Sequence, residues 1–296
     1  MKIGVLGVCH DKVVDPALMA RAVEDMGFES FFMGEHTAVP VDVKSAHPSA
    51  PDHVMPDYYY EVPSPLIGLA FAAAATKRIR IGTSICLVAE HHPLELAKTV
   101  ATLDRYSGGR LIFGIGSGWN AEEAALFNID FKRRWGITRD YVQAMIALWT
   151  QHDSAYEGKY TRFPTVRQYP KPVQKPYPPI HIGAFVDVAL KDVATYASGW
   201  MPGTGGDMLP IPVFAQRVQF VRRICEEAGR DFNEIEITCM VTDESLEPRR
   251  LLDEYRAAGA HRLVFFCPGN QGAAPEYGID GMRRRLDQIA AAYLTP

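Results

Sequence analysis

The chain has 296 residues, of which 47% are hydrophobic and 22% are charged, as in ordinary globular proteins. Its 31 Lys and Arg against 35 Asp and Glu give a net charge of −4, and no long basic run indicates a nucleic-acid surface. The most apolar helical stretch, residues 66–75, is far too short to cross a membrane. The amino-terminal residues resemble a strand rather than a signal peptide, which favours a cytoplasmic protein.

Short apolar runs alternate with helical patterns along the whole chain. Eight runs have the character of strands, in chain order residues 3–8, 30–33, 79–88, 111–115, 180–183, 199–201, 236–241 and 262–266. Helical patterns follow them at about residues 15–27, 65–75, 93–107, 121–150 in two parts, 187–198, 210–228, 248–258 and 278–292.

Runs such as LVFF at residues 263–266 are apolar throughout, as expected for parallel strands buried on both faces. Eight β–α units of this kind close naturally into a (β/α)8 TIM barrel. We therefore predict one barrel domain over residues 1–296, with an open doubly wound sheet as the alternative.

Two long segments do not fit the minimal β–α unit. Residues 37–64 follow the second strand and are rich in proline and tyrosine. Residues 152–179 follow the fourth strand and contain YEGKYTRF, which predicts a small hairpin turning at Gly158. Loops of this length in a compact domain are usually functional or disordered, and the tyrosine content favours ordered walls around a site.

Five cysteines occur without any Cys-x-x-Cys pair, so neither a zinc site nor a disulfide framework is predicted; they are Cys9, Cys86, Cys225, Cys239 and Cys267. A metal-dependent hydrolase would carry a His-x-His pair after the first strand, where only His10 occurs. No strand end carries the lysine of a Schiff-base aldolase. The sequence therefore predicts no metal site and favours another chemistry.

The residues after each strand line the active-site face of a barrel, and here they form a glycine-rich mouth. Gly114, Gly116 and Gly118 allow the backbone to approach a flat or anionic ligand, although glycines after a strand are also common in tight turns. Gly183-Ala184 offers a second platform of this kind. His36, directly after the second strand, has the chemistry of a proton donor or acceptor, but a polar loop residue is an equal interpretation.

These motifs, in order, resemble the luciferase-like flavin/deazaflavin superfamily and, within it, the coenzyme F420-dependent branch. The matching segments are FFMGEHTAVP, RIRIGTSICLVAEHHPLELAKTVATLDRYSGGRLIFGIGSGWNAEEAALF, EGKYTRF, PKPVQKPYPPIHIGA and SGWMPG. They cover most of residues 28–203.

The resemblance implies roles by position. Glu35-His36 corresponds to the family's acidic-His pair, with His36 as general acid or base and Glu35 orienting it. A non-prolyl cis peptide is expected at Ser84-Ile85, where it would contact one face of the deazaflavin ring. Further cofactor contacts are expected from two loops, at Gly116, Ser117, Gly118 and Asn120 and at Gly183 and Ala184.

Two segments depart from the family pattern. Phe185 and Val186 stand where the family has small polar residues, which suggests a rearranged site for the cofactor's tail. The segment KRRWGITRDYV, residues 132–142, also departs from the family pattern, and the resemblance assigns no role to its residues.

The implied function is hydride transfer between coenzyme F420 and an unidentified organic substrate. The aromatic, uncharged long loops favour a hydrophobic substrate over a sugar phosphate, with looser candidates for substrate contacts at Tyr58, Tyr59, Tyr60, Glu90 and His91. The alternatives are an FMN-dependent monooxygenase that uses reduced flavin and oxygen, and a barrel that binds cofactor without catalysis. A homodimer is expected, because superfamily members are commonly dimers.

Overall fold

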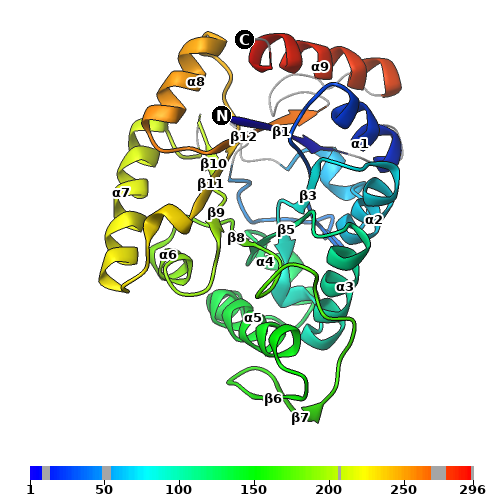
Figure 1. Cartoon of the computed structure of the whole chain (residues 1–296), viewed down its shortest axis with the longest axis vertical. Coiled ribbons are helices and arrows are strands. Elements are labelled where there is room, and N and C mark those ends of the chain that lie inside the picture. Colours follow the sequence, from blue (N-terminus) through cyan, green and yellow to red (C-terminus); the bar gives the residue numbers. More distant parts are fainter. Residues whose placement is uncertain (9–13, 49–54, 206–207, 268–277, 295–296) are drawn as a thin grey trace.

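The computed structural model describes residues 1–8, 14–48, 55–205, 208–267 and 278–294 (Figure 1). Its parallel strands form a closed eight-stranded barrel surrounded by helices, and this confirms the predicted fold. The neighbouring strands around the barrel are β1 (Lys2–Gly7), β2 (Ser30–Met33), β3 (Arg80–Thr83), β5 (Leu111–Gly116), β8 (Ile180–Ile182), β9 (Gly199–Trp200), β11 (Glu236–Val241) and β12 (Arg262–Cys267). The ring closes because β12 pairs with β1 and β9 pairs with β11.

The third predicted strand is divided in two. β3 ends at Thr83, and the chain continues as β4 (Cys86–Leu87), which pairs with β5. A non-prolyl cis peptide joins Ser84 to Ile85 between the two parts, as predicted. The sixth barrel strand, β9, is likewise followed by a short strand, β10 (Gly203–Thr204), which pairs with β11.

The helices surround the barrel (Figure 1), and their bounds are α1 (Pro16–Asp25), α2 (Pro65–Ala75), α3 (Pro93–Tyr106), α4 (Ala121–Leu126), α5 (Arg134–Thr150), α6 (Asp187–Val193), α7 (Ile211–Glu227), α8 (Pro248–Ala257) and α9 (Gly278–Tyr293). Four of them begin with proline, whose fixed φ and missing N–H suit the first helical position. The pattern predicted helix to residue 198, but α6 ends at Val193, because the N–H groups of residues 195–197 turn back to the Asp192 carbonyl. None of the described helices is long and apolar enough to span a membrane.

The two insertions have structure of their own. The predicted hairpin forms from β6 (Ser154–Glu157) and β7 (Arg162–Val166), and the Gly158 N–H donates to the Thr161 carbonyl at 2.9 Å. The segment after β2 contains the short 3-10 helix η1 (Asp57–Tyr60). Among the described cysteines, Cys86, Cys225, Cys239 and Cys267 are buried thiols that form no disulfide with one another, and Cys9 lies outside the described residues.

The interior of the barrel has an apolar layer near the carboxyl ends of its strands and a charged layer near their amino ends. The apolar side chains include Leu6, Phe32, Ile112, Met201, Met240, Val264 and Phe266. The charged layer centres on Arg262, which is 1% exposed and donates to Glu29 at 2.7 Å and to Glu236 at 2.8 Å. The pKa of Glu236 is raised by burial, but Arg262, Lys2 and His181 outweigh this and lower it to about 2.

Candidate active site

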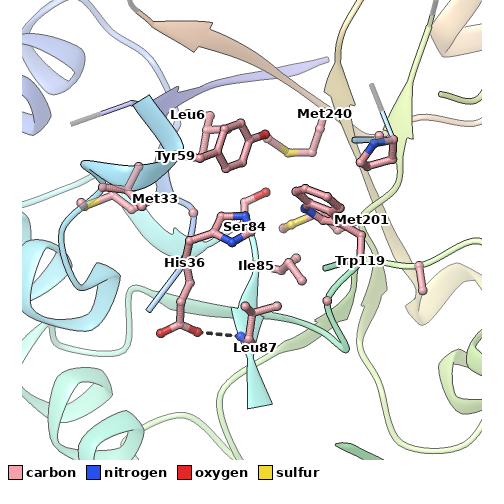
Figure 2. Close-up of a pocket in the computed structure, with 18 of the residues that line it drawn as sticks. Leu6, Met33, His36, Tyr59, Ser84, Ile85, Leu87, Trp119, Met201 and Met240 are labelled. Carbon is pink, nitrogen blue, oxygen red and sulfur yellow. Dashed lines mark hydrogen bonds between the residues drawn. The ribbon is translucent and has the colours of Figure 1, made fainter. Parts of the chain in front are cut away.

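A cavity of about 370 Å³ opens at the carboxyl ends of the strands (Figure 2). This volume lies within the usual range for small-molecule sites. Its side chains are mainly apolar or aromatic, and they include Leu6, Met33, Tyr58, Tyr59, Ile85, Trp119, Met201, Met208, Met240 and Phe266. The insertion after β2 contributes part of this wall, but residues 152–179 contribute none of it. The expectation that both insertions shape the site is therefore wrong for the second one.

His36 lies on the wall of this cavity, three residues after the end of β2. Its Nδ1 lies 2.6 Å from Oε2 of Glu123, which comes from α4 and whose side chain is 1% exposed. The other oxygen of Glu123 accepts from the Thr37 N–H at 2.9 Å, which fixes the carboxylate. Because a carboxylate accepts, Nδ1 carries the proton and Nε2 is the atom left to exchange one. Among the described residues, Nε2 has no hydrogen-bond partner.

Aromatic rings hold the imidazole on its other sides. Tyr59 and Trp119 both pack edge-on against His36, with ring centroids at 4.9 Å and 5.9 Å (Figure 2). The same two rings contact His47 in the same manner, at 4.9 Å and 5.0 Å. Together these contacts hold the His36 ring in one orientation inside an apolar wall, where a proton transfer would be shielded from bulk water.

Glu35 does not orient His36, so that prediction is wrong. Its carboxylate accepts from the Leu87 N–H at 2.6 Å, the dashed line in Figure 2, and lies 2.9 Å from Nε2 of His91. Glu35 therefore fastens the end of β2 to β4, just beyond the cis peptide. Glu123 takes the orienting role that the resemblance had assigned to Glu35.

A third carboxyl, Glu90, lies close to these two acids. Burial raises its pKa, and the nearby charges of Glu123 and Glu35 raise it further, to about 8. We therefore expect Glu90 to be neutral at pH 7, since ionising it would add a third negative charge to a partly buried cluster. Neither Glu90 nor His91 lines the cavity, so their predicted substrate contacts are not supported.

Glu35, Cys86 and His91 are grouped closely enough to resemble a set of metal ligands, with potential ligand atoms within 4.8 Å of one another. Their hydrogen bonds already account for this closeness, because Glu35 is shared between the Leu87 N–H and His91. Burial and the charge of Glu35 raise the pKa of the Cys86 thiol well above its ordinary value. The contacts of Glu35 with the Leu87 N–H and His91 hold β4 against the end of β2.

The cis peptide and two glycines form one side of the cavity. Ser84 and Ile85 both line it, and the Ile85 side chain packs directly on Gly116 and Gly183. A Cβ at either glycine would overlap Ile85, so this close approach requires glycine at both positions. Gly116 lies behind the wall and does not line the cavity itself.

The loop between β5 and α4 places Ser117, Gly118 and Trp119 on the cavity. Gly118 has a φ of +76°, a backbone conformation that favours glycine. Asn120 is 2% exposed, and its side chain accepts from the Glu123 N–H at 3.0 Å as the cap of α4. Its predicted direct contact with a cofactor is thus replaced by a structural role that holds Glu123 in place.

The loop after β8 completes the predicted cofactor site. Gly183 and Ala184 line the cavity, and the Ala184 carbonyl accepts from Nε1 of Trp200 at 2.6 Å. Phe185 and Val186 line it too, so the departure from small polar residues leaves an apolar surface here. Of the three tyrosines predicted to contact the substrate, Tyr58 and Tyr59 line the cavity and Tyr60 does not.

The main residue that sequence reasoning missed is Glu123. It stands three residues after Asn120, the spacing of a capping box, in which an acidic side chain serves only its own helix. Its partner His36 is 87 residues away in the chain, so no local pattern joins the two. The residue directly before Glu123 is also acidic, so the sequence does not show which of the two reaches the site. The Glu122 side chain accepts from the N–H groups of Lys44 and Ser45 instead.

Comparison with known proteins places this site in context. The family model described as luciferase-like monooxygenase matches residues 16–289 of the chain. An uncharacterized protein of Mycobacterium tuberculosis is 37% identical over 233 residues, 78% of this chain and 80% of that protein. The F420-dependent glucose-6-phosphate dehydrogenase of Intrasporangium calvum is 25% identical over 90% of this chain and 75% of its own length.

Other relatives differ in cofactor. The FMNH2-dependent dimethylsulfone monooxygenase of Pseudomonas putida is 30% identical, over 43% of this chain and 35% of its own length. Among solved structures, the monooxygenase RslO1 from Streptomyces bottropensis superposes with a TM-score of 0.74, at 22% identity and over 99% of both chains. At that identity the superposition supports the fold alone.

Proposed function

The chain belongs to the luciferase-like monooxygenase family, and on that premise we propose that it is an oxidoreductase that holds coenzyme F420 at the mouth of its barrel. In this proposal His36 is the general acid or base, and the substrate is a small, largely apolar organic molecule. The observation that carries the proposal is His36 itself, with Nδ1 bound to buried Glu123 and Nε2 without a partner among the described residues, at the wall of an apolar cavity.

The residues of the cavity suit a flat, extended cofactor. Gly116 and Gly183 let Ile85 and the backbone around it form a smooth side, and Ser117 and Gly118 bring backbone groups to the same space. The proposed contacts are therefore Ser84, Ile85, Ser117, Gly118, Gly183 and Ala184, with Gly116 and Asn120 supporting them from behind. When bound, F420 would supply two-electron hydride transfer, which leaves the protein to bind, orient and move a proton.

The preference for F420 over FMN is supported by how much of the chain each kind of relative matches. A relative named as F420-dependent aligns with 90% of this chain, whereas the one named as FMNH2-dependent aligns with 43%. The P. putida relative has the higher identity over its shorter match, and this favours an FMN-dependent monooxygenase as the second candidate.

The proton chemistry follows from the hydrogen bonds of His36. In the neutral ring, Glu123 holds the proton on Nδ1, so Nε2 could accept the hydroxyl proton of an alcohol substrate. The hydride from the carbon that carries this hydroxyl would go to the bound deazaflavin. In the opposite direction the protonated ring donates from Nε2 to the developing oxygen. Glu123 stabilises the protonated ring in both directions, because its carboxylate is buried beside it.

The experiment that tests the proposal is a turnover screen with small alcohols and ketones, followed through the absorbance of F420. Sugar phosphates serve as the comparison set, and oxygen consumption with reduced FMN is measured in parallel. F420 turnover with an apolar alcohol or ketone would support the proposal. Oxygen consumption with reduced FMN, without any F420 turnover, would establish the second candidate instead.

A further inference from the structure

One side of the cavity is apolar and takes no part in the proposed cofactor contacts. Its side chains are Leu6 from β1, Met201 just after β9, Met240 from β11 and Phe266 from β12, and each is only 2–8% exposed. They belong to one hydrophobic cluster. Because β12 pairs with both β1 and β11, with Leu6 and Phe266 as register partners, these side chains form a continuous surface, which we call the apolar floor.

Two thioethers of the apolar floor are directed into the cavity. Figure 2 shows Met201 and Met240 pointing into it from the side that faces His36. Met33 also lines the cavity, but its sulfur packs on Gly68 of α2, where a Cβ would come within 2.7 Å of it. A polarisable thioether makes favourable contacts with aromatic rings, and a saturated ring gains no such contact. Two thioethers in one space therefore favour a flat aromatic ring there.

The apolar floor offers a ligand no strong hydrogen-bonding side chain. Thr242, which lines the cavity two residues after Met240, has its hydroxyl directed at the carbonyls of Thr204 and Gly205, at 3.0 and 2.9 Å. A sugar or another polyhydroxylated body would place hydroxyl groups here without partners, which costs binding free energy. We therefore expect the polar end of the substrate at Nε2 of His36 and its body on the floor.

We propose that the apolar floor binds the aromatic ring of an aryl alcohol or aryl ketone, with the ring against Met201 and Met240 and the oxygen directed to Nε2 of His36. This inference rests on the proposed function and narrows its substrate to one class. The chemical step is unchanged: a hydride leaves the carbinol carbon for the bound deazaflavin, the hydroxyl proton goes to Nε2, and the C–O bond becomes a carbonyl. Reduction of the ketone reverses each of these transfers.

The test compares two ketones with the same carbon skeleton, acetophenone and methyl cyclohexyl ketone, by calorimetric titration of the chain with and without F420. The saturated ring is the more apolar of the two, so burial alone would favour it. Contact with the two thioethers reverses this order. We expect the Kd of acetophenone to be lower by at least about threefold in both titrations.

The double variant Met201→Leu/Met240→Leu keeps the volume and the apolar character of the floor but removes both sulfur atoms. We expect it to bind the two ketones with Kd values within about twofold of each other. The matched control is Met145→Leu, at a buried methionine on α5 that does not line the cavity, and it should keep the wild-type ratio. A ratio of two ligands on one protein is insensitive to a general loss of folded protein.

Proton NMR of the methionine methyl groups gives a second readout, which locates the ring. Bound acetophenone should shift the methyl resonances of Met201 and Met240 through its ring current and leave that of Met145 unchanged. Methyl cyclohexyl ketone has no ring current and should shift all three much less. The two Leu substitutions assign the resonances, since each removes one of them.

Equal Kd values of the two ketones in the wild type, tighter binding of the saturated ketone, or a double variant that keeps the preference would overturn the inference. Turnover distinguishes this failure from a failure of the proposed function. A preference for acetophenone in binding, without any F420 turnover, would support the ring site and contradict the proposed function. F420 turnover that favours methyl cyclohexyl ketone over acetophenone would support the function and overturn the inference.

Discussion

At the scale of single residues, the candidate site depends on a histidine and a buried carboxylate from different parts of the chain. His36 follows β2 and Glu123 belongs to the first turn of α4, and they meet at 2.6 Å. The resemblance placed His36 correctly at the mouth of the barrel. It could not identify Glu123, because the adjacent Glu35 offered a simpler partner and the 120–123 spacing explained Glu123 as part of a helix cap.

The first prediction concerns His36. His36→Ala should lower kcat by about 10²–10⁴, because a positioned acid–base group contributes that much to a proton transfer. The Kd for the cofactor should change little, as the proposed cofactor contacts come from other residues. Steady-state kinetics and a binding titration measure the two quantities, and an unchanged kcat would remove His36 from the mechanism.

The second prediction separates Glu123 from its neighbour. Glu123→Gln keeps the shape of the side chain and an acceptor for the Thr37 N–H, but it removes the negative charge beside His36. We expect kcat to fall by about 10- to 100-fold, corresponding to about 1.4–2.7 kcal/mol of lost stabilisation. Cofactor affinity should be retained.

Glu122→Gln is the matched control, since this side chain is directed to backbone groups of residues 44 and 45. It should leave kcat near the wild-type value. Equal losses in the two variants would mean that α4 contributes only structure to the site.

At the scale of elements, the strands could be predicted from the sequence, but the side-chain hydrogen bonds that join one element to the next could not. The apolar runs identified all eight barrel positions, because strands buried on both faces carry few polar residues. The helix carboxylates that hold one element to the next were not predicted, since each has the appearance of a solvated helix residue. Glu24 on α1 is an example, because it accepts from the N–H groups of Lys77, Arg78 and Ile79 at 2.6–3.1 Å and so holds the turn between α2 and β3.

The third prediction tests this fastening. Oε2 of Glu24 accepts from all three N–H groups, and Glu24→Gln replaces this charged acceptor with a weaker, neutral amide oxygen and sets an NH2 group against the Lys77 N–H. The free energy of unfolding should fall by about 1–3 kcal/mol, measured by urea denaturation. Asp25→Asn, an exposed neighbour on the same helix, should change it by less than about 0.5 kcal/mol. Equal free energies of unfolding for the Glu24 and Asp25 variants would show that the hydrogen bonds to Glu24 contribute nothing to stability.

At the scale of the whole molecule, function and stability lie at opposite ends of the barrel. The cavity and His36 lie at the carboxyl ends of the strands, and the Arg262 cluster lies at the amino ends. The cluster had a signal in the sequence, because charged residues stand at or beside the starts of several strands: Lys2, Glu29, Arg80, Glu236 and Arg262. Taken one strand at a time, each has the appearance of an exposed terminal residue, and only closure of the barrel brings them together.

The fourth prediction concerns acid stability. His181 on β8 is 1% exposed, and burial lowers its pKa to about 3, with the attraction of Glu236 opposing this. The unfolded chain binds a proton at His181 below about pH 6.5 and the folded chain does not, so stability falls as the pH drops from about 6.5 to 3. His181→Leu should reduce this slope by up to about 1.4 kcal/mol per pH unit.

Urea denaturation of the wild type and His181→Leu at several pH values between 4 and 7 measures that slope. The Glu236 carboxylate acts in the same direction at lower pH, because its folded pKa of about 2 lies below its ordinary value. Parallel slopes for the two proteins across pH 4 to 7 would contradict the assignment to His181.

The central claim is that the cavity beside His36 binds a deazaflavin, and a binding titration of the purified chain with oxidised F420 and, separately, with FMN tests it most directly. Absorbance and fluorescence of each cofactor report the binding. The account predicts a micromolar or lower Kd for F420 and binding of FMN at least about tenfold weaker. Tighter binding of FMN would move the protein to the flavin-dependent monooxygenases, and binding of neither cofactor would contradict the account.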